Sequence, residues 1–119
     1  MQYVMLIYQP DSVFSARTDE KEQEFWGAWR AYYNAMVEAG VYLGGDRLER
    51  PSTATTVRVR DGKRHVQDGP FADSKEQLGG FIVLELPSLD KALDWAARCP
   101  TAARGTIEVR PVGKAPTIT

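Results

Sequence analysis

Six consecutive residues near the start of the chain are apolar or aromatic, Tyr3-Val-Met-Leu-Ile-Tyr8, and a second run of the same kind is Gly80-Phe-Ile-Val-Leu-Glu-Leu86. Apolar runs this short, bounded by turn residues, are typical of buried strands. Successive side chains of a strand point to opposite faces of its sheet, so both faces of both strands are apolar. We therefore expect two central strands that need cover on both sides.

The segment that follows Asp19 predicts a long amphipathic helix. Asp19 with Glu22 three residues later resembles a capping box, and Gly40 supplies the stop. Aromatic and apolar residues recur at helical spacing and predict the buried face: Phe25, Trp26, Trp29, Tyr33, Met36 and Val37. The residues between them predict the exposed face: Glu20, Gln23, Gly27, Arg30, Asn34 and Glu38. Residues 9–18, between the first strand and this helix, read as turns.

A second helix is predicted to begin at Ser88, directly after Pro87, and to end at Pro100. Its expected buried stripe is Leu89, Ala92, Leu93 and Ala96. Two further strands are expected at residues 41–48 and 106–112. In the latter, Ile107 and Val109 should point inward, and Pro111 indicates an edge strand.

Asp61-Gly62 is the strongest short hairpin signal in the chain. A two-residue turn there pairs Arg60 with Lys63, Val59 with Arg64, Arg58 with His65 and Val57 with Val66. One face of this hairpin, at about residues 55–68, then carries the three valines with Arg64. The other face carries Arg58, Arg60, Lys63 and His65.

Without the hairpin, the expected order is βαββαβ, the ferredoxin-like unit of an α+β protein. Its two helices cover one face of the sheet, so the second apolar face stays open, and such a face usually marks an interface. We expect a homodimer packed through its sheet faces; a monomer with an open face is the alternative. Residues 1–112 should form one domain, and residues 113–119 a loose tail.

The bulk composition limits the classes of function. The chain has 119 residues, 43% of them hydrophobic and 26% charged, and a net charge of −1. This is an ordinary globular composition with no overall attraction for nucleic acid. Cys99 is the only cysteine and His65 the only histidine, so no metal site is expected. The apolar N-terminus lacks a basic leader and is too short to span a membrane, which favours a cytoplasmic protein.

The segment Asp68-Gly-Pro-Phe-Ala-Asp-Ser-Lys-Glu-Gln-Leu-Gly-Gly-Phe81 resembles the signature of the DGPF branch of the YCII-related proteins. Residues 52–63 and 94–110 are similar to that branch too, and the likeness covers about residues 1–112. The resemblance implies a dimeric α+β barrel. It also implies a suspected enzyme with a histidine on the first helix and an aspartate as an active pair. This chain has no histidine between Asp19 and Ala39, which puts that mechanism in doubt.

The candidate site residues gather around the same segment. Asp68 reads either as a turn residue, with Gly69 and Pro70, or as a carboxylate at the mouth of a cleft walled by Phe71. Glu76 is the second acid–base candidate, and Lys75 beside it is a candidate anchor for an anionic substrate. The charged turn of residues 73–77 has the spacing of a short helical start.

Further candidates lie on the first helix and the second strand. Trp26, Trp29 and Tyr33 are either core residues or the lining of a cleft for a flat or apolar ligand. Asp46 and Arg47 read as a surface ion pair or as cleft residues. His65 has nothing nearby to orient it, so its role stays open. The basic hairpin face is either plain solvated surface or a contact for an acidic partner.

Two hypotheses follow from these residues and the resemblance. The first is a dimer that binds, and transforms by acid–base chemistry of Asp68 and Glu76, a small organic ligand without metal or organic cofactor. The second is a non-enzymatic accessory protein. It rests on the branch's resemblance to proteins encoded beside, or fused to, extracytoplasmic-function sigma factors, so a sigma factor would be its partner.

Overall fold

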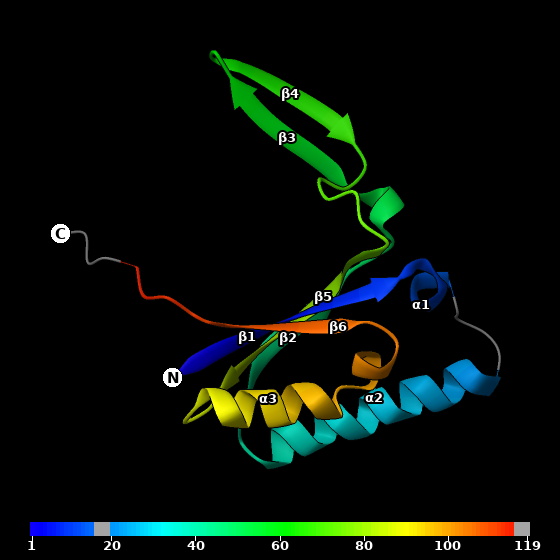
Figure 1. The fold of residues 1–119 in the computed structure, drawn as a ribbon, viewed down its shortest axis with the longest axis vertical. Helices are drawn as coiled ribbons and strands as arrows, with labels where there is room; N and C mark the ends of the chain where they lie inside the picture. Colours follow the sequence, from blue (N-terminus) through cyan, green and yellow to red (C-terminus); the bar gives the residue numbers. More distant parts are fainter. Residues whose placement is uncertain (16–19, 116–119) are drawn as a thin grey trace.

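The computed structural model describes residues 1–15 and 20–115. Four strands form one antiparallel sheet in the order β2-β5-β1-β6: β1 (Gln2–Pro10), β2 (Tyr42–Arg47), β5 (Glu76–Glu85) and β6 (Thr106–Pro111). The helices α2 (Glu20–Glu38) and α3 (Leu89–Arg98) lie together on one side of this sheet (Figure 1). The two apolar runs form the central strands β1 and β5, and the strand order is that of the ferredoxin-like unit. The predicted α+β fold is confirmed.

Register explains why one sheet face is filled and the other is not. Met5 pairs with Ile82 on β5 and with Val109 on β6, so the three side chains share a face. That face packs under the helices as the core, with Met5 and Leu84 fully buried. The opposite face carries apolar side chains that stay only half-buried: Val4, Leu6, Tyr8, Leu78, Phe81 and Val83. We call it the open face.

The helix α2 turns a slightly different side to the core than its sequence predicts. Tyr32, which the sequence analysis left out, is 4% exposed and its hydroxyl donates to the Trp95 carbonyl oxygen at 2.7 Å. Tyr33 and Val37, predicted to be buried, are about half exposed, at 46% and 48%. The contact with Trp95 of α3 buries Tyr32, so the buried face of α2 is shifted by one residue from the predicted one.

The structure tests the signal predicted for the end of the first helix, whereas part of the signal for its start lies outside the described residues. Gly40 has a φ of +73°, the left-handed conformation that ends helices at glycine. Asp19 lies outside the described residues. Glu22 does form a close contact, but with Arg104, whose Nη1 lies 3.2 Å from its Oε1.

Two segments correct the sequence analysis. Residues expected as turns instead extend β1 to Pro10 and form the short helix α1 (Asp11–Ser15), because Val13 and Phe14 are buried. The turn at residues 73–77 is not helical: β5 begins at Glu76, and the Gln77 side chain donates to the Ala72 and Ser74 carbonyl oxygens.

The helix α3 starts and stops as predicted, but its stripe is narrower. The Ser88 hydroxyl accepts a hydrogen bond from the Lys91 N–H, and a short 3-10 helix, η2 (Pro100–Ala103), follows the last turn. Ala92 and Ala96 are buried, whereas Leu89 and Leu93 are each 48% exposed. The half-buried Trp95 packs on the core, so the helix is rotated toward it.

The hairpin forms with the predicted register. Arg60 pairs with Lys63 and Val57 with Val66 in β3 (Thr55–Arg60) and β4 (Lys63–Asp68). Asp61 and Gly62 both have positive φ, 52° and 73°, as a type I′ turn requires. A 3-10 turn, η1 (Pro51–Thr53), precedes it. We call residues 55–68 the arm.

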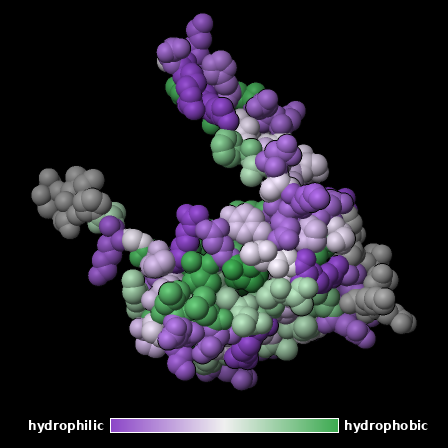
Figure 2. Space-filling view, viewed as in Figure 1, coloured by the Kyte–Doolittle hydropathy of each residue, from purple (hydrophilic) through white to green (hydrophobic). Residues whose placement is uncertain are grey.

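The arm projects from the sheet on the side away from α2 and α3 (Figure 1). In the space-filling view it stands free of the body (Figure 2). Its three valines are therefore exposed, at 59% for Val57, 60% for Val59 and 56% for Val66. Within residues 1–15 and 20–115, no helix combines the length and the apolar character that a membrane crossing requires.

Candidate functional site

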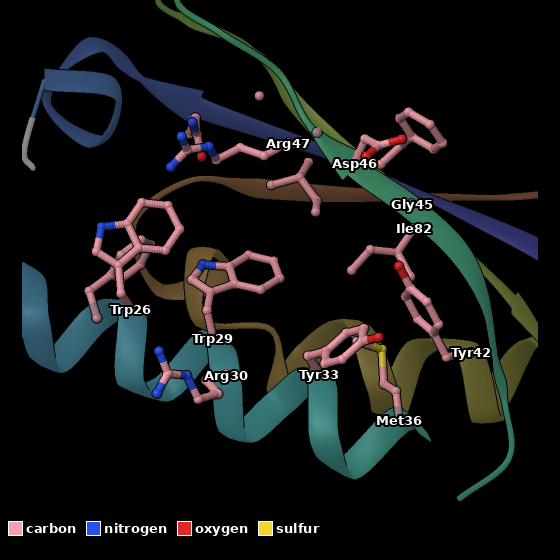
Figure 3. Close-up of a pocket in the computed structure, with 16 residues that line it drawn as sticks. Trp26, Trp29, Arg30, Tyr33, Met36, Tyr42, Gly45, Asp46, Arg47 and Ile82 are labelled. Carbon is pink, nitrogen blue, oxygen red and sulfur yellow. The ribbon is translucent and has the colours of Figure 1, made fainter. Parts of the chain in front are cut away.

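A cavity of about 410 Å³ lies between α2 and the β2–β5 edge of the sheet. Figure 3 shows the side chains of α2 rising into it from one side and those of β2 closing the other. The residues that argue for a ligand are few and of three kinds: aromatic rings, glycines and arginines.

The aromatic wall comes mainly from successive turns of α2. Trp26, Trp29 and Tyr33 follow one another at spacings of three and four residues, so they lie on one side of the helix. Tyr42 closes the wall from β2, with its ring 4.9 Å from that of Tyr33 in an edge-to-face arrangement. The pKa of Tyr42 is raised, first by the partial burial of its ring and then by Tyr33 and Asp46. Its hydroxyl therefore keeps its proton in neutral solution and can donate a hydrogen bond.

Three glycines leave the opposite wall bare. A Cβ on Gly45 would meet the Phe81 carbonyl oxygen, and a Cβ on Gly80 would lie 2.9 Å from that of Asp46, so β2 and β5 approach too closely there for side chains. At Gly79 a Cβ would meet the Gln9 side chain. Glycine in a strand often marks close backbone approach, and here it lets β2, β5 and the Gln9 side chain pack closely along the cavity wall.

Two arginines supply charge. Arg47 places its guanidinium carbon 5.0 Å from the centre of the Trp26 ring, and Arg30 lines the cavity from α2. Asp46 also borders the cavity, but it pairs with Phe81 in the sheet, whereas Arg47 pairs with Gly80. Because neighbouring residues of a strand face opposite ways, the Asp46 carboxylate points to the open face, as Figure 3 shows.

The structure divides the candidate residues into two groups. Trp26, Trp29, Tyr33 and Arg47 meet in the cavity, with Asp46 at its border. A second hollow of about 510 Å³ lies where the arm joins the open face, and Pro70, Phe71 and Glu76 line it. Three candidates line neither: Asp68, Gly69 and Lys75.

The segment that follows the arm lines the second hollow. Glu76 accepts a hydrogen bond from the Thr106 hydroxyl at 2.8 Å, and Phe71 is 76% exposed with the Arg58 guanidinium carbon 5.2 Å from its ring centre. Asp68 ends β4 opposite Thr55, and the Gly69 N–H donates to the Ala54 carbonyl oxygen at 2.8 Å. Within a single copy of the chain, Asp68 therefore lies at the base of the arm, apart from the aromatic cavity.

Sequence reasoning missed three cavity residues. Arg30 is exposed, as predicted for its side of the helix, and it borders the cavity because it follows Trp26 by one turn. Tyr42 and Gly45 were read only as part of a strand. Their register with Leu84 and Ile82 places them on the helix side of the sheet, and only pairing in three dimensions reveals that register.

Comparison with known proteins agrees with this architecture. Residues 1–115 match the YCII-related domain. The chain belongs to the YCII-related family. An uncharacterised protein of Rhizobium meliloti (strain 1021) is 40% identical over 114 residues, covering 94% of this chain and 92% of that one.

A solved structure resembles this YCII-related protein over nearly its whole length. It is 5-chloro-2-hydroxyhydroquinone dehydrochlorinase from Burkholderia phenoliruptrix AC1100, in complex with 2,5-dihydroxybenzoquinone. The TM-score is 0.55 at 16% identity, and the match covers 97% of this chain and 96% of the other. The likeness is one of fold. Neither relative supports a link of this YCII-related protein to a sigma factor.

Proposed function

We propose that this YCII-related protein binds a small, flat organic molecule in the cavity between α2 and the sheet. The observation that carries the proposal is the pairing of an aromatic wall with a bare glycine wall around about 410 Å³. Ligand pockets of this size are mostly apolar with a few placed polar groups. The dehydrochlorinase of the same fold, whose solved complex holds a quinone ring, supports the same class of ligand.

A thermal-shift screen of small organic molecules tests the proposal. A ligand at a hundred times its dissociation constant adds about 2.7 kcal/mol to the free energy of unfolding. Tyr33→Ser removes part of the aromatic wall at a half-exposed position, and Phe71→Ser removes an exposed ring from the second hollow. We expect ligands that stabilise the wild type and Phe71→Ser but not Tyr33→Ser. A full screen with no stabilising compound contradicts the proposal.

The second hollow is the place for the acid–base chemistry that we propose for Glu76 and Asp68. Glu76 lines it next to an exposed aromatic ring, and Asp68 stands at the arm's base just before it. Ligands lost in Phe71→Ser and kept in Tyr33→Ser would favour this hollow. Turnover of such a ligand should then fall in Asp68→Asn and Glu76→Gln, while its binding persists.

We also propose that the protein is a homodimer packed through the open face. That face holds six half-buried apolar side chains, and the arm extends beyond it. The radius of gyration is 16.6 Å, whereas a compact chain of this length has about 13.5 Å. An isolated two-stranded hairpin is at best marginally stable in water, so the arm's exposed valines favour a covering surface.

Charge favours a second copy of this chain as the cover. Of the chain's 15 Lys and Arg and 16 Asp and Glu, the arm holds four and two, so the remainder is net negative. A positive arm therefore finds opposite charge on its own partner. The basic face of the arm also suits the accessory hypothesis, in which it meets an acidic protein; reversing Arg58 and Arg60 to Glu would then abolish capture of that protein.

A further inference from the structure

The charges that line the α2 cavity are unbalanced. Arg30 and Arg47 both border it, and Asp46, the only acidic residue among those described that does so, directs its carboxylate to the open face. Within residues 1–15 and 20–115, neither guanidinium has a carboxylate within 4.0 Å. The cavity therefore presents two positive groups without a negative partner from the described chain.

The two arginines occupy one end of the cavity. Figure 3 shows Arg47 over Trp26 on the sheet side and Arg30 beside the helix α2, on the other side of that ring, whereas Tyr33, Met36 and Tyr42 form the other end. The Arg47 guanidinium carbon lies 5.0 Å from the centre of the Trp26 ring, within the range of a cation–π interaction. Arginine held this way keeps its remaining N–H donors free to form a fork with a carboxylate.

The rest of the cavity suits the uncharged part of such a ligand. Trp29, Tyr33 and Tyr42 offer ring faces and edges, and Gly79 and Gly80 add no side chains of their own to the sheet wall.

We propose that the ligand is an aromatic carboxylate, with its ring against the aromatic wall and its carboxylate at the Arg30–Arg47 end. This inference rests on the proposed function and names the ligand class of the same site. It assigns Arg30 and Arg47 to binding and specificity, a role that their exposed positions on a helix and an edge strand would not indicate.

Calorimetric titration with two probes of the same shape tests it. 2-Naphthoate carries the carboxylate and 2-naphthamide replaces it with a neutral amide. We expect 2-naphthoate to bind the wild-type protein at least about tenfold more tightly, because hydrogen bonds to charged groups are the stronger class. Arg30→Met and Arg47→Met keep the aliphatic stem and remove the charge. Each should reduce that preference several-fold and leave 2-naphthamide binding unchanged.

Arg98→Met is the matched control. Arg98 also stacks on a tryptophan, 4.3 Å from the centre of the Trp95 ring, but outside the cavity. It should keep the full preference for 2-naphthoate. Equal affinity of the wild type for both probes would overturn the inference while the cavity still binds a flat ring. No binding of 2-naphthoate at millimolar concentration would overturn it too. The Tyr33→Ser screen then decides separately whether the cavity binds any ligand.

Discussion

Arg104 Nη1 lies 3.2 Å from Glu22 Oε1, and this contact joins the first turns of α2 to the segment before β6 across 82 positions of sequence. The Glu22 side chain is 6% exposed, and Arg104 also stacks its guanidinium carbon 4.9 Å from the Phe25 ring centre. The pair therefore fixes the start of α2, the helix that carries the aromatic wall of the cavity.

Arg104→Met should lower the free energy of unfolding by about 1–3 kcal/mol, because it leaves the Glu22 carboxylate buried without this cation. The lower part of the range reflects the partial exposure of Arg104. Urea denaturation measures the change. Arg110→Met is the control: Arg110 contacts Glu108 at 2.6 Å on the surface, where such pairs contribute about 0–1 kcal/mol. Equal losses in the two variants would contradict a special role for the buried pair.

Gly45→Ala should destabilise the protein by about 1–3 kcal/mol, since the new methyl group collides with the Phe81 carbonyl oxygen and forces β2 away from β5. Gly27→Ala is the matched change on α2, where nothing lies within 4 Å of the added Cβ. It should stabilise by about 0.5–1 kcal/mol, because alanine restricts the unfolded chain and favours helix. Denaturation midpoints of both variants, compared with that of the wild type, show whether each change lowers or raises stability.

Val83→Arg should convert the proposed dimer into a monomer, because Val83 lies on the open face of a central strand and a buried arginine there has no partner. Leu93→Arg introduces the same charge at an exposed apolar residue on the helix side. It should leave the dimer unchanged. Sedimentation velocity over a range of concentrations measures both. A wild-type protein that sediments as a monomer throughout would rule out the dimer.

The Cys99 thiol should make stability fall in alkaline solution. Burial raises its pKa from 9.0 to about 11 in the folded protein. The unfolded chain releases this proton near pH 9 while the folded protein keeps it. The stabilisation is therefore complete below pH 9 and is lost as pH rises to about 11, a change on the order of 2–3 kcal/mol.

Cys99→Ala should lose most of that slope between pH 9 and 10. Above pH 10, Tyr32 adds a second fall in both proteins, because burial above all raises the pKa of its hydroxyl. Unfolding free energies measured at half-unit steps of pH separate the two groups. An unchanged slope below pH 10 in Cys99→Ala would mean that the thiol is not the source.

Local chemistry made part of the fold predictable. Asp61-Gly62 dictates a type I′ turn, and the turn alone fixes the pairing of Arg58 with His65 and of Val57 with Val66. The continuous apolar runs likewise identify β1 and β5 as central strands. These signals lie within a few residues of each other, so no knowledge of distant packing was required.

Distant packing explains what could not be predicted. Tyr32 and Tyr33 are adjacent and chemically alike, and only the position of Trp95 decides which one is buried. Distant packing also explains why the predicted site residues fall into two separate groups. Trp26, Trp29 and Tyr33 share a helix and stayed together, whereas Asp68 was linked to them by the expectation of a common cleft. Asp68 ends β4 at the base of the arm and does not line the cavity.

The two ends of the arm meet at its base, where Gly69 N–H donates to the Ala54 carbonyl oxygen and Thr55 pairs with Asp68. Everything between these residues leaves the body and returns to the same place. The residues between Thr55 and Asp68 can therefore be exchanged as a cassette: a two-residue turn, or a hairpin taken from another protein, would span the same gap. The chain offers a ready insertion point for a label or a foreign loop, at a distance from the cavity that the helix α2 builds.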